Sequence, residues 1–178
     1  VNDIEKTYDN IQSYSADIEN RLDGDRFDVD QEWQLSVQKP DKYKRVVVKI
    51  NDQVQEPPAV EICNGAKLYS SDGGITEPYN CENLVKQTFD VIEKLNLFTS
   101  TSYNSVAEID GGDAKVTISL VGDKSKTEIW VDMSSYMIKR IRYNTPQASG
   151  SATKRTEVYK DIQLNQNFEE DVFTIPTN

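Results

Sequence analysis

The sequence contains no histidine among its 178 residues. Histidine is the side chain that most often acts as an acid or base near neutral pH, and its ring nitrogens are common metal ligands. Its absence excludes Ser-His-Asp and Cys-His catalysis and imidazole metal sites. Most familiar hydrolase mechanisms are excluded with them. We therefore expect a protein that is not an enzyme and that holds no cofactor and no metal.

Long apolar runs and excess positive charge are also missing. No run of 18 apolar residues is present that could span a bilayer as a helix. Thirty acidic residues outweigh 20 basic ones, which gives a net charge of -10. Such a surface repels nucleic-acid phosphates and anionic lipid headgroups, so neither nucleic acid nor an anionic membrane surface is an expected partner. The same acidity can simply keep the protein soluble.

Cysteine is scarce, because Cys63 and Cys81 are the only two. The count fits one disulfide in an oxidising compartment and equally fits two reduced thiols. Two cysteines without histidine make a poor zinc site. The pair is therefore a disulfide candidate, and bridging requires the two Cα atoms to lie close together.

Hydrophobic periodicity predicts two helices and a majority of strands. Ile4, Tyr8 and Ile11 are spaced as one stripe of an N-terminal amphipathic helix, and a second helix is predicted over residues 83–97. Alternating apolar residues between turn signals predict about eight or nine strands. The segments with this pattern lie around residues 16–22, 27–37, 43–50, 103–109, 114–120, 126–132, 136–144 and 156–164. A hairpin is predicted between Val60/Ile62 and Leu68, with Asn64-Gly65 as its turn, and "QEPPA" is predicted as a loop.

This order of elements predicts one α+β domain over residues 1–178, built mainly from antiparallel strands. A sheet of that many strands accumulates twist and must curl or close, and its concave side must be filled. Two short helices leave either a dry packed core or an apolar cavity that holds apolar ligands. The candidate wall residues of such a cavity are Trp33, Leu35, Val37, Val48, Ile62, Leu68, Phe89, Ile92, Ile118, Ile129 and Ile141.

Several short motifs occur in an order that resembles one known family. They are "IQSYSAD", the strand end Val-Gln-Lys-Pro-x-x-Tyr, Ile-Cys-Asn-Gly-x-x-Leu-Tyr, "IWVDMSSYMIKRI" and the closing Phe-Thr-Ile-Pro. The chain resembles, from about Ile4 to Pro176, the outer-membrane lipoprotein carrier family with the LolA-type fold. The resemblance implies a strongly curved, unclosed antiparallel barrel whose concave side is covered by helices that act as a lid over a hydrophobic cavity. In the carriers this cavity accepts the acyl chains of lipoproteins.

The family's strand-ending Arg-Pro matches Lys39-Pro40, which makes these two residues the expected rim of the cavity. In the carriers the arginine holds the lid shut by hydrogen bonds to its backbone. Lysine keeps the charge and loses the planar fork of donors, so it can bond one or two carbonyls at most. The ordinary expectation for a lysine in a turn is full solvation.

The resemblance implies an extracytoplasmic protein, periplasmic or at the cell surface; a lipid anchor, if the protein has one, would be attached through a segment before Val1. Its expected partners are a lipid or acylated lipoprotein and a membrane-anchored donor or acceptor protein, and the expected state is a monomer. The alternative is a module for protein interaction or envelope sensing with the same fold and a filled core. A third interpretation is an enzyme or calcium-binding protein that uses a carboxylate pair at Asp110 and Asp113 or at Asp28 and Asp30, but turn chemistry accounts for both stretches.

Overall fold

The computed structural model describes residues 2–24, 27–89, 103–120, 124–146 and 152–176. Over these residues the chain forms eleven strands, two α-helices and one 3-10 helix. The elements are α1 (Asn2–Asn10), β1 (Ser13–Gly24), β2 (Phe27–Gln38), β3 (Lys42–Ile50), β4 (Gln53–Asn64), β5 (Lys67–Ser70), β6 (Gly74–Thr76), α2 (Cys81–Phe89), β7 (Tyr103–Asp110), β8 (Asp113–Leu120), β9 (Lys126–Asp132), β10 (Ile138–Pro146), β11 (Ala152–Leu164) and η2 (Glu170–Phe173).

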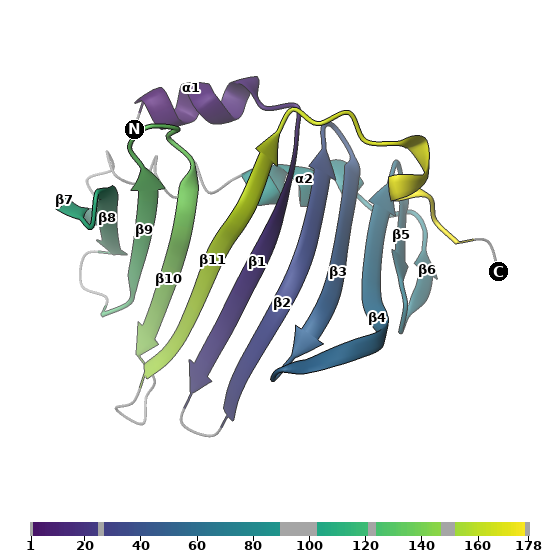
Figure 1. Cartoon of the computed structure of the whole chain (residues 1–178), viewed down its shortest axis with the longest axis horizontal. Coiled ribbons are helices and arrows are strands. Elements are labelled where there is room, and N and C mark those ends of the chain that lie inside the picture. Colours follow the sequence, from purple (N-terminus) through teal and green to yellow (C-terminus); the bar gives the residue numbers. More distant parts are fainter. Residues whose placement is uncertain (1, 25–26, 90–102, 121–123, 147–151, 177–178) are drawn as a thin grey trace.

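The strands form one antiparallel sheet in the order β6-β5-β4-β3-β2-β1-β11-β10-β9-β8-β7. The first and last strands of the chain, β1 and β11, pair at its centre and join an N-terminal to a C-terminal series of hairpins. The sheet is curved and its two edges, β6 and β7, are separate strands, so the barrel is unclosed (Figure 1). This confirms the predicted α+β architecture.

Local turn chemistry sets several of the strand boundaries. Asn51 and Asp52 between β3 and β4 both have positive φ, at 49° and 62°, as do Gly111 and Gly112 between β7 and β8, at 62° and 95°. Two consecutive residues with positive φ form the type I′ turn that matches the twist of a hairpin. Asparagine, aspartate and glycine are the residues that tolerate this conformation.

The "QEPPA" segment is a correction to the sequence prediction, because it lies within β4 and not in a loop. Val47 pairs with Ala59 and Lys49 pairs with Val54, so four residues of β4 stand opposite Val48 alone. The ladder is interrupted at this irregularity, where prolines without an N–H are tolerated. This irregularity in the strand pairing accommodates a segment whose sequence is typical of a loop.

The second helix starts two residues earlier than predicted. Its N-cap is Asn80, whose Oδ1 accepts a hydrogen bond from the backbone N–H of Asn83 at 2.8 Å. The helix is described as far as Phe89. The remaining part of the predicted helix, residues 90–97, lies outside the described residues.

The two faces of the sheet differ in chemistry. Tyr14, Ala16 and Ile18 alternate along β1 and are buried, and we call the face that they share the inner face. In Figure 1, α2 lies behind the sheet on this side, and α1 runs along the upper ends of β9, β10 and β11. The outer face carries the intervening residues of β1, among them Asp17 and Glu19.

The C-terminal segment crosses from the end of β11 to β3 and β4, where η2 packs (Figure 1). Ser13 donates its hydroxyl proton to the carbonyl of Gln166 at 2.7 Å, and the side-chain amide of Asn64 donates to the carbonyl of Phe173 at 3.2 Å. Phe173 is 2% exposed. This segment therefore buries an aromatic ring outside the cluster beneath the helices.

Candidate functional site: the helix-covered inner face

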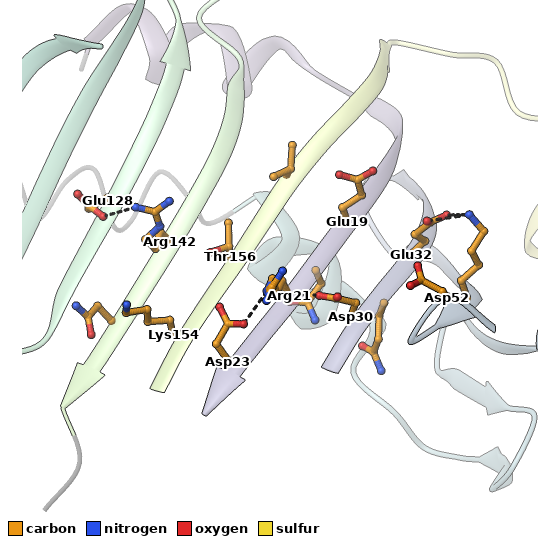
Figure 2. A pocket seen from close by; sticks show the side chains of 15 residues that line it. Glu19, Arg21, Asp23, Asp30, Glu32, Asp52, Glu128, Arg142, Lys154 and Thr156 are labelled. Atoms are coloured by element: carbon orange, nitrogen blue, oxygen red, sulfur yellow. Dashed lines mark hydrogen bonds and ion pairs between the residues drawn. The ribbon is translucent and has the colours of Figure 1, made fainter. Parts of the chain in front are cut away.

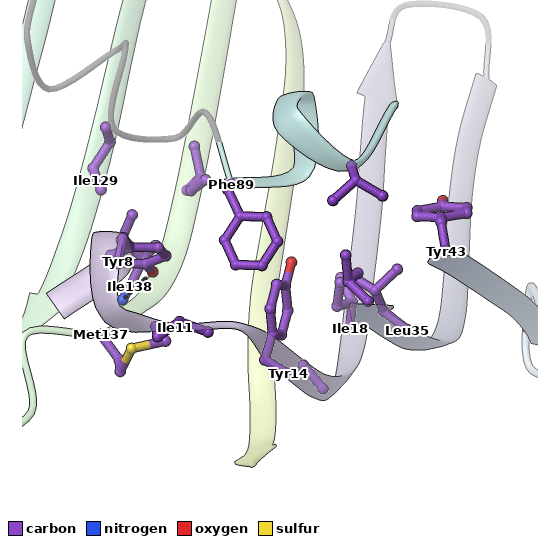
Figure 3. Close-up of a cluster of buried hydrophobic side chains, with 14 of the residues drawn as sticks. Tyr8, Ile11, Tyr14, Ile18, Leu35, Tyr43, Phe89, Ile129, Met137 and Ile138 are labelled. Atoms are coloured by element: carbon purple, nitrogen blue, oxygen red, sulfur yellow. Dashed lines mark hydrogen bonds between the residues drawn. The ribbon is translucent and has the colours of Figure 1, made fainter. Parts of the chain in front are cut away.

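The candidate site is the cluster of apolar side chains between the helices and the inner face. Figure 3 shows Phe89 of α2 pointing down onto Tyr14 of β1, and their ring centroids lie 5.3 Å apart in an edge-to-face arrangement. Edge-to-face contact is a favourable geometry for aromatic pairs. Val85, one turn before Phe89, is also buried, so a single face of α2 covers the sheet.

Tyr8 of helix α1 and Ile11, which directly follows the helix, close the cluster at the rim, and both are buried. The Tyr8 hydroxyl accepts a hydrogen bond from the backbone N–H of Ile138 in β10 at 3.2 Å. Burial raises the pKa of Tyr8 to about 12. This phenol therefore stays protonated at neutral pH and fixes α1 to the strand end.

A small hollow remains where the two helices meet the sheet. Its volume is about 20 Å³, and it is lined by Tyr8, Tyr14, Thr88, Met137, Ile138, Tyr159 and Ile162. About 10–15 Å³ suffices for one water molecule, whereas ligand sites run from about 300 to 1,000 Å³. In the described part of the chain, this hollow is too small for a lipid chain unless the helices move.

Lys39 is not the fully solvated turn residue that its position suggests. Its ammonium group donates a hydrogen bond to the carbonyl of Tyr8 at 3.3 Å and lies 4.5 Å from the centroid of the Phe89 ring. Partial desolvation lowers the pKa of Lys39. One side chain at the end of β2 thus contacts both helices at once. The lysine binds a single carbonyl in the last turn of α1, and this carbonyl also accepts the backbone N–H of Ile11 at 3.2 Å.

Pro40, the other predicted rim residue, is exposed and contributes to a different feature. It borders an open hollow of about 480 Å³ at the start of α2, together with Asp41, Tyr79, Asn80 and Glu82. The two adjacent residues therefore face different surroundings. Lys39 reaches the helices, and Pro40 lies at the surface.

Most predicted wall residues lie together on the inner face. Eight of them belong to the cluster or pack against it. Six are buried members: Leu35, Val37, Phe89, Ile118, Ile129 and Ile141. Leu68 and Trp33 pack against them half-buried, and the guanidinium of Arg45 lies 5.2 Å from the ring centroid of Trp33. Ile92 lies outside the described residues.

Two predicted wall residues are placed elsewhere. Ile62 pairs with Tyr69 and Lys44, whereas its neighbour Cys63 pairs with Leu68, so Ile62 points to the outer face. It is buried there, apart from the cluster. Val48 stands at the irregularity opposite "QEPPA" and borders a separate surface hollow of about 180 Å³ with acidic neighbours. These two residues are removed from the candidate wall.

A disulfide ties α2 to the sheet. Cys63 at the end of β4 and Cys81 at the start of α2 are bonded, with their Cα atoms 5.6 Å apart, and both side chains are fully buried. The bond closes a loop that spans 18 positions of sequence and includes β5 and β6. The position of α2 over the cluster is therefore fixed covalently at its first residue.

Sequence reasoning missed a polar group at the lower margin of the cluster. Asn20 and Glu157 pair across β1 and β11, point to the inner face and are each 7% exposed. Arg155 and Tyr159 flank Glu157 on the same face. The strand "TEVYKDIQL" carries the signal, since Glu157 alternates with Tyr159 on the face that the pattern assigns to the interior.

The outer face holds a hollow of about 790 Å³ near the lower ends of β1, β2, β10 and β11. Figure 2 shows that charged side chains line it. Several are paired: Arg21 with Asp23 at 2.6 Å, Lys49 with Glu32 at 2.8 Å, and Arg142 with Glu128 at 3.5 Å. An acyl chain placed here would displace solvated charges and gain little apolar contact. The volume is adequate for a ligand, but the chemistry does not suit an apolar one.

No group of three or more acidic or cysteine side chains that could hold a metal ion occurs among the described residues. No helix in the described part of the chain is long and apolar enough to cross a membrane.

Comparison with known proteins gave matches to solved structures alone. No family model matches the sequence, and no curated protein matches it. MucB of the Pseudomonas aeruginosa MucA/MucB complex superposes with a TM-score of 0.52 at 9% identity, over 97% of this chain and 58% of that chain. The chain thus spans little more than half of the length of MucB.

Two further structures match over nearly their whole length. The LolA superfamily protein NE2245 from Nitrosomonas europaea has a TM-score of 0.43 at 11% identity, with 97% of this chain and 96% of that chain covered. LprF from Mycobacterium bovis has a TM-score of 0.47 at 10% identity, with 99% and 97% covered. The unclosed curved antiparallel sheet with its few helices matches a LolA-like α+β fold. The chain has a LolA-like fold. At these identities the likeness shows the fold and nothing about the ligand.

Proposed function

We propose that the protein is a non-enzymatic, extracytoplasmic binding protein for apolar chains, such as the acyl chains of lipids or lipoproteins. The observation that carries the proposal is the closure of the apolar inner face by two helices through a few specific contacts. Tyr8 holds α1 by two hydrogen bonds, and Lys39 reaches both helices. An apolar chain would enter between α1 and the sheet and replace contacts that the helices now make.

The energetics of this exchange favour long chains. Each buried methylene contributes about 0.8 kcal/mol, so two additional methylenes correspond to roughly a tenfold gain in affinity. Against this gain stands the cost of moving α1 away from Tyr14, Met137 and Ile138. The contacts of Lys39 stabilise the closed state. Because only open molecules can bind, the apparent affinity equals the affinity of the open state multiplied by the fraction of molecules that are open.

Two observations support an extracytoplasmic location. A disulfide between Cys63 and Cys81 persists in oxidising compartments such as the periplasm or the cell surface. The solved structures with similar folds include a lipoprotein-sorting protein domain and MucB. We infer a monomer with one domain over residues 1–178, which receives its ligand from a membrane-anchored donor or passes it to a membrane-anchored acceptor.

The test is a chain-length series of fatty acids, measured by displacement of a fluorescent fatty acid and by native mass spectrometry of gently purified protein. We expect affinity to rise by roughly tenfold for every two methylenes. Lys39→Met keeps the length of the side chain and removes both contacts, so it should tighten binding by favouring the open state. Lys42→Met, a lysine on β3 whose ammonium lies 6.0 Å from the Phe173 ring, is the matched control and should leave affinity unchanged. Binding that does not depend on chain length would contradict the proposal.

A second candidate function is favoured by the close packing of the described cluster, whose hollow measures about 20 Å³. A filled interior suits a module that binds another protein through its surface, and MucB, a similar fold, was solved in complex with MucA. Capture of a specific partner protein that persists when Ile118 or Val116 is replaced by threonine would favour this function. Loss of partner binding together with lipid binding would favour the first.

A further inference from the structure

The inner face is divided into an apolar and a polar end. Along β1 the buried residues run from Tyr14 through Ile18 to Asn20 on one face, so the character changes within a single strand. On β11, Tyr159 pairs with Ile18, and Glu157 pairs with Asn20 on one side and with Ile141 on the other. The polar end therefore adjoins the apolar cluster directly.

The polar side chains form one connected network. The Arg155 Nε–H donates to Asn20 Oδ1 at 3.1 Å, and Arg155 Nη2 lies 2.5 Å from Glu157 Oε1. The second carboxylate oxygen of Glu157 accepts the Tyr159 hydroxyl proton at 3.0 Å. Burial beside Glu157 raises the pKa of Tyr159, so the phenol remains a donor. We call Asn20, Arg155, Glu157 and Tyr159 the inner polar network.

The charge of this network is balanced, with one guanidinium and one carboxylate in contact. The side chain of Glu157 is 10% exposed, whereas that of Arg155 is 45% exposed and retains donors that none of these bonds uses. An anion placed here would compete with Glu157 for Arg155, and a cation would compete with Arg155 for Glu157. An uncharged group with hydroxyls meets neither penalty and can both accept from Arg155 and donate to carboxylate or amide oxygens.

We propose that the inner polar network binds the uncharged, hydroxyl-bearing head of an amphiphile whose chain lies along the apolar cluster. The inference rests on the proposed function, since it assumes that the inner face takes an apolar chain. It adds the class of ligand, a neutral lipid with a polyhydroxyl head, and the residues that select it. On this view head chemistry, and not chain length alone, determines which lipid is held.

The experiment compares two probes with the same acyl chain, 1-monopalmitoylglycerol and palmitate, at neutral pH. The wild-type protein should bind the monoacylglycerol at least about tenfold more tightly, since one hydrogen bond to a charged group contributes roughly that factor. Glu157→Gln leaves Arg155 without its carboxylate and should strengthen palmitate binding until the preference is lost or inverted. Arg155→Gln leaves Glu157 unpaired and should weaken palmitate binding further.

The matched control is Glu128→Gln, which removes the carboxylate of an Arg–Glu pair on the outer face at 3.5 Å. It should leave the ratio of the two affinities within about twofold of the wild-type value. Thermal unfolding shows whether Glu157→Gln folds. If it does not, Arg155→Gln still provides the test, because Arg155 is the more exposed partner of the pair.

The outcomes separate the two proposals. If both probes bind with chain-length dependence but neither inner variant changes their ratio, the head site is wrong and the apolar-chain function stands. A wild-type preference for palmitate also overturns the head site. If neither probe binds any variant, the proposed function fails and the head site fails with it.

Discussion

The two faces of β9 bury neighbouring residues by different means. Ile129 points to the inner face and is fully buried beneath the helices among other aliphatic side chains. Trp130, the next residue, points to the outer face and is 5% exposed. Its ring is covered by cations, with Lys115, Arg140 and Arg142 between 5.2 and 5.4 Å from the ring centroid.

The difference shows that burial does not imply the same energetics on both faces. Inside, water is excluded by side chains without polar atoms, and any lost methylene leaves a cavity. Outside, the long side chains of Lys115, Arg140 and Arg142 cover the indole and place their charged groups over its ring, where the groups remain partly exposed to solvent. The free energy of unfolding should therefore depend strongly on side-chain volume at the inner face and only weakly on side-chain charge at the outer face.

The largest expected effect comes from truncation within the inner cluster. Ile141→Ala removes buried methylenes between β9 and β11 and should lower the free energy of unfolding by about 2–5 kcal/mol. Urea denaturation measures the loss. Val158→Ala, on the outer face of the adjoining strand, should cost less than about 1 kcal/mol. Equal losses at the two positions would remove the distinction between the faces.

Alkaline pH should act on the inner face through its tyrosines. Burial raises the pKa of Tyr8 and of Tyr43 to about 12 from an ordinary value of 10.0. Between these values the unfolded chain has released protons that the folded chain retains, so the stability present below pH 10 is lost as pH rises toward 12. The free energy of unfolding should fall by about 1.4 kcal/mol per pH unit for each tyrosine.

Substitution provides the check on this pH dependence, again by urea denaturation. Burial also raises the pKa of Tyr14 and Tyr159, so four tyrosines contribute to the slope and Tyr43→Phe should remove about a quarter of it between pH 10 and 12. Tyr136→Phe, at a residue 40% exposed, should leave the slope unchanged. A slope in the Tyr43 variant equal to that of the wild type would show that its phenol is not responsible.

The smallest expected effect is on the outer face. Arg142→Gln breaks the contact with Glu128 at 3.5 Å and one of the three cation contacts with Trp130. Because the guanidinium is 40% exposed and screened by solvent, the free energy of unfolding should change by less than about 1 kcal/mol, with the difference shrinking as salt is added. A loss as large as that of Ile141→Ala would mean that the outer cations, and not the inner cluster, hold the sheet.

The sequence predicts the strands and turns well because each depends on neighbouring residues. The predicted turn at Gly111-Gly112 follows from residues that accept positive φ. The turn at Asn51-Asp52 carries the same signal but is not predicted, because the loop is assigned to "QEPPA". The face of the sheet on which a residue lies is harder to predict where the register between two paired strands shifts. On β3, the residues that pair with inner-face side chains of β2 are Tyr43, Arg45 and Val47. Val48 falls at a register shift between β3 and both of its neighbours, and no local pattern indicates such an irregularity.

The placement of Ile62 could have been predicted. In a hairpin with a two-residue turn, cross-strand partners have opposite parity in sequence number, as for Cys63 with Leu68. Ile62 and Leu68 have the same parity and therefore cannot share a face, although both were assigned to the wall. The pairing rule, and not the hydrophobicity of either residue, determines the face on which Ile62 lies.

The inner polar network and the role of Lys39 depend on contacts between distant parts of the chain. Arg155 meets Asn20 across 135 positions of sequence, and Lys39 meets Tyr8 across 31. Periodicity assigns each residue to a face but does not identify its partner. An ionisable residue at an interior position, as at Glu157, is the sequence signal that such a partner exists.

The pairing of β1 with β11 has a consequence for how the protein is made. β1 leaves a ribosome or a translocation channel before β11 and obtains its second neighbour only when β11 arrives. Until then β1 pairs with β2 alone, and one row of its backbone amides and carbonyls stays available to any other extended segment. Correct pairing therefore competes with mispairing until β11 is attached, and this attachment is the step at which a chaperone would have the largest effect.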